Sequence, residues 1–381
     1  MMQAEFTLEG AQVLRDGQLA IGDIAVAGGV LSDDPAGPRV ALPGCTVLPG
    51  IVDSHGDGFE RHMAPRRGAV TDLTVGLAGV EAELAANGIT TAMLAQFWSW
   101  EGGMRGPEFA LRVLEAVERY QPVGTDIRVQ LRLETHLLDD YDAMEQAVDR
   151  FGIVQVVFND HLPHDALARG KRPPRLTGQA LKSGRNPDAH LAMMQDLHDR
   201  RADVPAAVEA LAARLAARGV MLGSHDDPDA ETRQLWRSRG VALSEFPETH
   251  EAALAARSGG DGIILGSPNV MRGGSHAGKV SARDMVTAGL CDALASDYFY
   301  PAPLKAAQIL ADEIGLPAAW TLVSDGPARL LGMADRGRIA AGLRADLVVL
   351  DPDGRVCLTV AGGCVTYASG IGAAALIGAR I

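Results

Sequence analysis

Short apolar runs alternate with amphipathic segments through the middle of the chain. Eight of these runs have the length and composition of buried strands. They lie within residues 47–57, 89–96, 127–135, 153–158, 220–224, 241–246, 262–266 and 290–296. Between them, helical periodicity is clearest at residues 72–87, 107–120 and 203–218. Eight strand–helix repeats over roughly 285 residues predict an α/β protein, a (β/α)8 TIM-like barrel with its active site at the carboxyl ends of the strands.

The two ends of the chain show a different pattern. Residues 1–46 and 334–381 carry short alternating β segments separated by turn signals such as Asp16-Gly17. We predict that these ends form one small β-sandwich domain and that residues 47–333 form the barrel. A doubly wound sheet is the alternative, but the first strand leads into His-Gly-Asp-Gly-Phe-Glu, which lacks the GxGxxG pattern of a dinucleotide site. Residues 162–203 are polar and rich in Lys and Arg, which predicts an insertion or lid near the active face.

Composition and charge narrow the functional classes. Hydrophobic residues make up 47% of the chain and aromatic residues 4%, which is typical of a globular core built from Ala, Val, Leu and Ile. A formal net charge of -13 disfavours nonspecific nucleic-acid binding. The four cysteines form no CxxC pair, and neither a signal peptide nor a run of membrane-spanning length is evident. We therefore expect a cytoplasmic protein with no nucleic-acid or membrane partner.

Potential metal ligands follow five of the predicted strands. His55 and Asp57 end the first run, and residues i and i+2 of an extended chain project to the same side. An imidazole and a carboxylate presented together suit a divalent transition metal. Further histidines and carboxylates at later strand ends are Glu134, His136, Asp160, His161, His225, Asp226, Asp227 and Asp297.

These residues also have ordinary structural explanations. Glu134 could pair with Arg132 or Arg128, His161 could begin a loop, and Asp297 could cap a following helix. Their joint accumulation at one mouth of a barrel favours the functional interpretation, because such groups are costly to desolvate without cations that neutralise them.

The pattern resembles the amidohydrolase superfamily over nearly the whole chain. The segment Leu48-Pro-Gly-Ile-Val-Asp-Ser-His-Gly-Asp57 is similar to the first-strand metal motif of that superfamily, with Asp57 where a second His is more usual. The segment from Gly337 to Val349 is similar to the return into its β-sandwich domain. By this resemblance Asp297 would be a metal ligand and the proton shuttle, and Glu134 would replace the carbamylated lysine of many members.

A narrower resemblance is to the diphosphatases of the carbon–phosphorus lyase pathway, which act on alpha-D-ribose 1-methylphosphonate 5-triphosphate. Five segments match in order, and they are residues 55–68, 224–227, 245–247, 268–276 and 295–298. The resemblance implies a metal-dependent hydrolase that releases pyrophosphate from this substrate in phosphonate catabolism. It implies one or two divalent ions, Zn²⁺ first and Mn²⁺ second, held by His55, Asp57, Glu134, His161, His225 and Asp297.

The order of the histidines leaves one question open. Many superfamily members take two further histidines from the fifth and sixth strands, whereas His161 and His225 follow the fourth and fifth predicted strands. Either a strand within residues 162–219 escapes the pattern, or one of the two histidines is not a ligand. His136, His250 and His276 are then the alternatives.

Basic residues near the first motif and in a later loop could bind phosphate groups. Arginine forks onto phosphate oxygens, and paired glycines can present backbone N–H groups to an anion. The candidate substrate-binding residues are Glu60, Arg61, His62, Arg66, Asn269, Arg272, Ser275, His276 and Lys279, with Arg67 and Gly273-Gly274 beside them. A solvated loop with internal salt bridges and a plain turn are the competing explanations.

Two other functions are consistent with the sequence. One is a metal-dependent amidohydrolase or deacetylase that acts on a C–N bond of a small anionic substrate, and the other is a metal-binding subunit without turnover. The basic residues beside the first motif favour phosphoanhydride hydrolysis. The expected partners are a small anionic phosphorylated sugar and further copies of the chain in a homo-oligomer.

Overall fold

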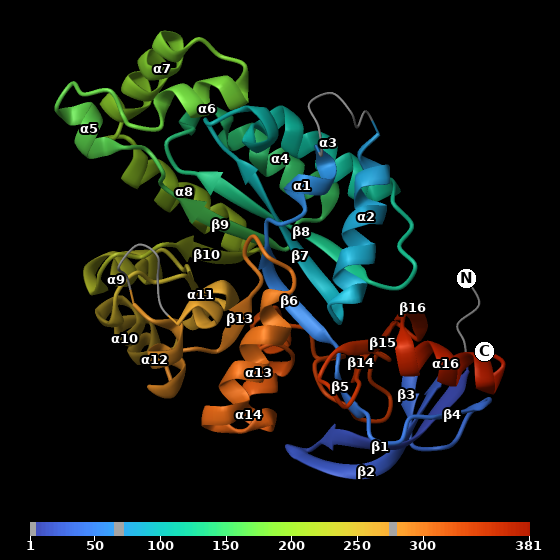
Figure 1. Cartoon of the computed structure of the whole chain (residues 1–381). Helices are drawn as coiled ribbons and strands as arrows, with labels where there is room; N and C mark the ends of the chain where they lie inside the picture. The colour runs from blue at the N-terminus through green and yellow to red at the C-terminus, as the bar shows by residue number, and fades with distance from the viewer. Residues whose placement is uncertain (1–4, 65–71, 274–279) are drawn as a thin grey trace. The chain divides into compact units, whose positions relative to one another are not determined.

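The computed structural model describes residues 5–64, 72–273 and 280–381 (Figure 1). The chain divides into two compact units by its internal contacts. The first contains Met1–Leu94, Tyr120–Arg128 and Ile264–Ile381, and the second contains Ala95–Arg119 and Val129–Ile263. Among the described residues, no helix is both long and apolar enough to span a bilayer.

All eight predicted barrel strands are present and lie in sequence order in one parallel sheet. They are β6 Ile51–Gly56, β7 Ile89–Trp98, β8 Asp126–Glu134, β9 Gln155–Asn159, β10 Met221–His225, β11 Leu243–Glu245, β12 Gly262–Gly266 and β13 Ala293–Ala295. A parallel bridge between Gly56 and Asp297 links the end of the first strand to the residues after the last. The predicted (β/α)8 barrel is therefore confirmed.

The predicted helices appear at their expected positions. Asp72 accepts a hydrogen bond from the Thr74 N–H at 3.0 Å and so caps the first of them. The helices of the barrel region are α1 Glu60–Met63, α2 Leu73–Ala86, α3 Pro107–Arg119, α4 Tyr141–Phe151, α5 His164–Ala168, α6 Leu176–Ser183, α7 Pro187–Asp199, α8 Val204–Ala217, α9 Ala230–Ser238, α10 His250–Gly259, α11 Ser267–Arg272, α12 Ala282–Thr287, α13 Ala302–Ile314, α14 Leu316–Thr321 and α15 Asp325–Leu330.

The two chain ends build a separate eight-stranded sheet, as predicted. Its strands are β1 Phe6–Arg15, β2 Gln18–Ala27, β3 Val30–Ser32, β4 Arg39–Ala41, β5 Thr46–Pro49, β14 Leu347–Leu350, β15 Val356–Ala361 and β16 Cys364–Ala368. The order is β16-β15-β14-β5-β1-β2-β3, with β4 also paired to β1. Leu376 of helix α16, Gly370–Ala379, joins the buried core of this sheet.

The first apolar run divides between the two sheets at Gly50. β5 pairs with β1 and β14 in the terminal sheet, whereas β6 begins the barrel. A Cβ atom at Gly50 would lie 2.3 Å from Thr90 Oγ1, so a side chain does not fit there. We therefore propose Gly50 as the crossing point between the domains, in place of the boundary before residue 47.

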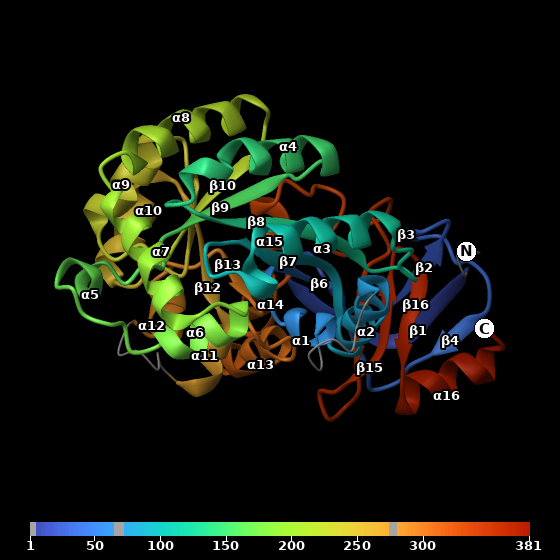
Figure 2. The same cartoon turned by 90° about the horizontal axis from the view of Figure 1, so that it is seen from above.

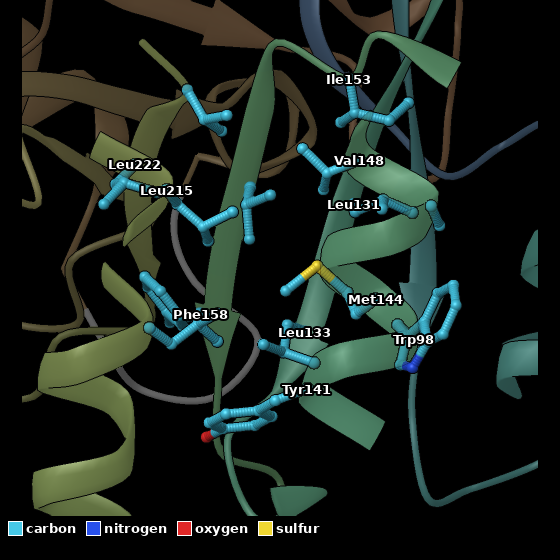
Figure 3. Close-up of a cluster of buried hydrophobic side chains, with 14 of the residues drawn as sticks. Trp98, Leu131, Leu133, Tyr141, Met144, Val148, Ile153, Phe158, Leu215 and Leu222 are labelled. Atoms are coloured by element: carbon cyan, nitrogen blue, oxygen red, sulfur yellow. The ribbon is translucent and has the colours of Figure 1, made fainter. Parts of the chain in front are cut away.

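One apolar cluster packs strands β8 to β10 against helices α3, α4 and α8. In Figure 3, Leu131 and Leu133 of β8, Met144 of α4 and Phe158 of β9 are part of this cluster. Figure 2 shows α4 and α8 beside strands β8 to β10, and both helices contribute buried residues to the cluster. Burial at roughly 25 cal/mol per Å² makes this cluster a main source of stability. It fixes the strands whose ends carry Glu134, His161 and His225.

The polar segment at residues 162–203 is helical, not a long loop. Helices α5, α6 and α7 lie together in Figures 1 and 2 and enclose a small apolar cluster that includes Leu162 and Met194. Residues 162–219 are all described, and they contain helices and turns but no strand. This region therefore adds no barrel strand to the eight predicted ones. The explanation that a strand within residues 162–219 escapes the pattern is wrong.

Candidate metal centre

The backbone locks three predicted ligands of the first unit together. The Asp297 N–H donates to the His55 carbonyl at 2.9 Å, and the Asp57 N–H donates to the Asp297 carbonyl at 2.8 Å. The Asp53 carboxylate reinforces this junction, since it accepts from the Ser296 N–H at 2.8 Å and from the Ser296 hydroxyl at 2.6 Å. The ends of β6 and β13 are thus held side by side.

Glycine is required between His55 and Asp57. A Cβ at Gly56 would lie 2.6 Å from Asp53 Oδ2 and 2.8 Å from Ser296 Oγ. The His-Gly-Asp sequence of the first motif therefore follows from close packing against the last strand.

Among the described residues, three non-glycine residues at the ends of barrel strands have left-handed backbones. Asp226 has φ 60°, Phe246 has φ 54° and Asp297 has φ 56°. Such conformations cost about 1–3 kcal/mol each and cluster at functional sites. Two of the three carry carboxylates that could bind a cation.

Glu134 is fully buried at the end of β8 and is held by two neighbours. One oxygen contacts His161 Nδ1, and the other accepts from the His161 N–H at 3.0 Å and from Trp100 Nε1 at 3.1 Å. Burial alone would raise the pKa of Glu134, but the hydrogen bond and charge of His161 outweigh it and lower the pKa. The carboxylate is therefore ionised, as a metal ligand must be.

His225 presents its Nε2 atom as an acceptor. Arg132 Nη2 lies 2.9 Å from this nitrogen, and a guanidinium can only donate. The ring is wedged edge-on against Phe246 with centroids 5.0 Å apart, and Nδ1 lies 3.2 Å from Asp226 Oδ2. At this separation His225 Nδ1 and Asp226 Oδ2 could both bind one cation.

The structure brings together two predicted ligands and one residue that was not assigned a role. His161, His225 and Asp226 each offer a ligand atom within 4.8 Å of the others. Two imidazoles and a carboxylate match the donors that Zn²⁺ prefers, so these residues fit a divalent metal. The Ser-His-Asp-Asp segment carried the signal for Asp226, but sequence spacing could not choose between its two carboxylates.

A large cavity opens over this group within the second unit. Its volume is about 770 Å³, and His161, His225 and Asp226 line it together with Thr135, Arg201 and Trp236. Cavities of this size hold substrates or cofactors of small-molecule enzymes.

The alternative histidines have other surroundings. His136 lies with Asp160 and His164 in a separate group that lines the same cavity, and His250 is exposed at the first turn of α10. His276 lies outside the described residues.

The predicted phosphate-binding residues are partly brought together. Arg61 Nη1 donates to the Tyr298 carbonyl at 3.1 Å, and Arg272 contacts the Tyr298 hydroxyl, so both arginines gather beside the residue after Asp297. Glu83 pairs with Arg61 and with His62, where Nε2 and Oε2 are 2.5 Å apart. Arg61 and His62 therefore form the internal salt bridges that the competing explanation, a solvated loop, requires.

The remaining candidates are less informative. Asn269 spans its own loop, since its side chain donates to the Val280 carbonyl at 3.1 Å and accepts from the Ala282 N–H at 3.0 Å. Glu60 is half-buried in the first turn of α1. The candidates outside the described residues are Arg66, Arg67, Gly274, Ser275, His276 and Lys279.

A buried arginine supports the loop that carries His225 and Asp226. Arg233 is fully buried, with Nη1 3.2 Å from Asp227 Oδ2 and Nε 3.2 Å from Asp261 Oδ2. It also donates to the Val241 carbonyl at 2.5 Å. Burial raises the pKa of Asp227 and lowers the pKa of Arg233, so both charges depend on their pairing.

We expect Arg233→Met to lower the free energy of unfolding by about 3–5 kcal/mol, because Asp227 would be left buried without its cation. Urea unfolding followed by circular dichroism measures the change. The control is Arg150→Met, which removes a surface pair with Glu115 and is expected to cost less than about 1 kcal/mol. Equal stability of the two variants would contradict the supporting role of Arg233.

Comparison with known proteins gives one relative of moderate identity. The chain is 33% identical over 321 residues to alpha-D-ribose 1-methylphosphonate 5-triphosphate diphosphatase from Escherichia coli strain K12, which covers 80% of this chain and 82% of that protein. No protein-family model matches the chain.

Solved structures share the fold at low identity. N-acetyl-D-glucosamine-6-phosphate deacetylase from Mycobacterium smegmatis has a TM-score of 0.62 and 16% identity over 96% of this chain and 100% of its own. A triazine hydrolase variant has a TM-score of 0.61 and 15% identity, with 99% and 98% coverage. An adenosine deaminase from Xanthomonas campestris with bound zinc has a TM-score of 0.53 and 14% identity, with 98% and 96% coverage.

Proposed function

Because this chain belongs to the alpha-D-ribose 1-methylphosphonate 5-triphosphate diphosphatase family of the amidohydrolase superfamily, we propose that it hydrolyses a phosphoanhydride of that sugar triphosphate and releases pyrophosphate. The observation that carries the proposal is the group His161, His225 and Asp226 on the wall of a cavity of about 770 Å³. The relative from Escherichia coli, which is named for this substrate, supports the choice of reaction.

The proposed metal ligands are those that the sequence indicates, with Asp226 added. They are His55, Asp57, Glu134, His161, His225, Asp226 and Asp297. A divalent ion bound there, Zn²⁺ or Mn²⁺, would lower the pKa of a water molecule and neutralise charge on a phosphoryl oxygen. Metal analysis of the purified protein would give the number of ions bound per chain.

The side chains of this chain would supply the remaining steps. The Asp297 carboxylate is proposed to accept the proton of the attacking water, which makes it the general base. Trp100 and the His161 N–H hold the Glu134 carboxylate in one orientation. Arg61 and Arg272, which contact the carbonyl and the hydroxyl of Tyr298 respectively, are proposed to bind phosphate oxygens of the substrate.

The direct test measures pyrophosphate release from alpha-D-ribose 1-methylphosphonate 5-triphosphate. The protein is reconstituted first with Zn²⁺ and then with Mn²⁺, and the bound metal is counted per chain. Metal-dependent release of pyrophosphate is expected. Bound metal without release, combined with hydrolysis of an N-acetylated sugar phosphate, would instead favour action on a C–N bond.

We expect Arg61→Ala to raise KM for the triphosphate about tenfold, because one charge-assisted hydrogen bond to phosphate is lost. The effect on kcat should be smaller, since the arginine binds the substrate before and during the reaction. Steady-state kinetics measure both constants. Arg39→Ala, which removes an exposed arginine paired with Glu9 in the terminal sheet, serves as the control. An unchanged KM would show that Arg61 does not bind the substrate and that its role is the structural pairing with Glu83.

A further inference from the structure

A second group of potential ligands lies beside the candidate metal centre and shares none of its residues. His136 follows β8, Asp160 follows β9, and His164 begins α5. Their ligand atoms all lie within 4.8 Å of one another. The rings of His136 and His164 are close, with centroids 4.7 Å apart.

The distances in this group suit a tetrahedral ion. Asp160 Oδ1 lies 3.1 Å from His164 Nε2 and 3.5 Å from His136 Nδ1, so the first distance would lengthen by a few tenths of an ångström around an ion. Ligands bound to zinc at about 2.0–2.2 Å in a tetrahedron are themselves roughly 3.3–3.6 Å apart. A cation could therefore bind among these three groups with little movement of the side chains.

A third histidine contacts the group on the far side of the His164 ring. His198 of α7 is buried, and its Nδ1 lies 2.7 Å from His164 Nδ1, on the opposite side of the ring from the atom that faces Asp160. The Leu162 N–H also donates to Asp160 Oδ1 at 3.2 Å. Partners on the second nitrogen of a histidine and on a carboxylate are typical of the residues around a metal site.

We propose that His136, Asp160 and His164 form a second site for a divalent transition metal, with His198 as the residue that positions His164. Two imidazoles and one carboxylate with an open fourth position suit Zn²⁺ or Co²⁺. The ion would tie helix α5 to the ends of β8 and β9. Since these three residues also line the cavity of about 770 Å³, the ion would fix part of its wall.

The test counts tightly bound metal in the full-length protein. Wild-type protein, His164→Gln and His250→Gln are stripped of metal, loaded with Zn²⁺, dialysed and analysed by mass spectrometry. His250 is an exposed histidine of the same unit, so its variant controls for surface binding. We expect His164→Gln to hold one Zn²⁺ per chain fewer than wild type, and His250→Gln to match wild type. An equal count in all three proteins would overturn the proposal.

Titration with Co²⁺ separates this site from the candidate metal centre. The visible absorption of bound Co²⁺ is recorded in wild type, His164→Gln, His225→Gln and the double variant. We expect each single variant to lose a different part of the spectrum and the double variant to lose both. If His164→Gln fails to fold, His136→Gln takes its place. A spectrum that neither His164→Gln nor His136→Gln changes would exclude the second site, whatever the outcome of the pyrophosphate assay.

Discussion

Replacing Asp297 with Asn is expected to lower kcat for pyrophosphate release by about two to four orders of magnitude, the usual contribution of a general base. The substitution removes proton acceptance but keeps an oxygen at the same position. Asn also tolerates the left-handed backbone that Asp297 adopts at φ 56°, so the strand junction should survive. Metal content is expected to stay close to that of wild type.

The control for this variant is Asp16→Asn. Asp16 has nearly the same backbone conformation, φ 51°, in the turn between β1 and β2 of the terminal sheet. This variant should keep full activity, and both variants should have similar circular dichroism spectra. Normal turnover by Asp297→Asn would rule out the proton-acceptor role.

Removal of metal is expected to reduce hydrolysis by at least roughly three orders of magnitude, since a bound cation contributes several kcal/mol of charge stabilisation and tenfold in rate corresponds to about 1.4 kcal/mol. The loss is measured after dialysis against a chelator and then against metal-free buffer. Addition of Zn²⁺ or Mn²⁺ should restore activity in proportion to the metal bound.

Acid should weaken the binding of the metal on which hydrolysis depends. Ligating histidines must be neutral, so protons compete with the cation as the pH falls. Burial alone would lower the pKa of His161, but the hydrogen bond and charge of Glu134 outweigh it and raise the pKa. The amount of Zn²⁺ needed for half-maximal activity is therefore expected to begin to rise at a pH above about 6.5, the ordinary pKa of His. Full activity of the chelated protein at any pH would contradict a metal-dependent mechanism.

The architecture could be predicted from the sequence because it depends on local patterns. Each barrel strand is a short apolar run, and helix α2 is bounded by Asp72 and Asn87 as the pattern indicated. The division at Gly50 could not be predicted in this way. Val47 and Val52 look alike in sequence, and only the pairing of β5 with β14 assigns them to different sheets.

The candidate site was predictable only in part, because its contacts join distant residues. The strand-end rule selected His161 and His225, which do approach each other, with ring centroids 6.0 Å apart. No local pattern indicated that Trp100 would donate to Glu134 or that His198 would support His164. These pairs depend on how the helices after residue 162 pack, which polar composition concealed.

The pairing of β5 with β14 also sets an order of events during synthesis. The register joins Val47 to Val349, about three hundred positions later in the chain. While a ribosome is still making the intervening residues, β5 can pair with β1 but its other edge stays open. An open apolar edge invites pairing with other chains. Nascent chains that stop before residue 347 should therefore be prone to aggregation and depend on chaperones, even if every barrel strand has already been made.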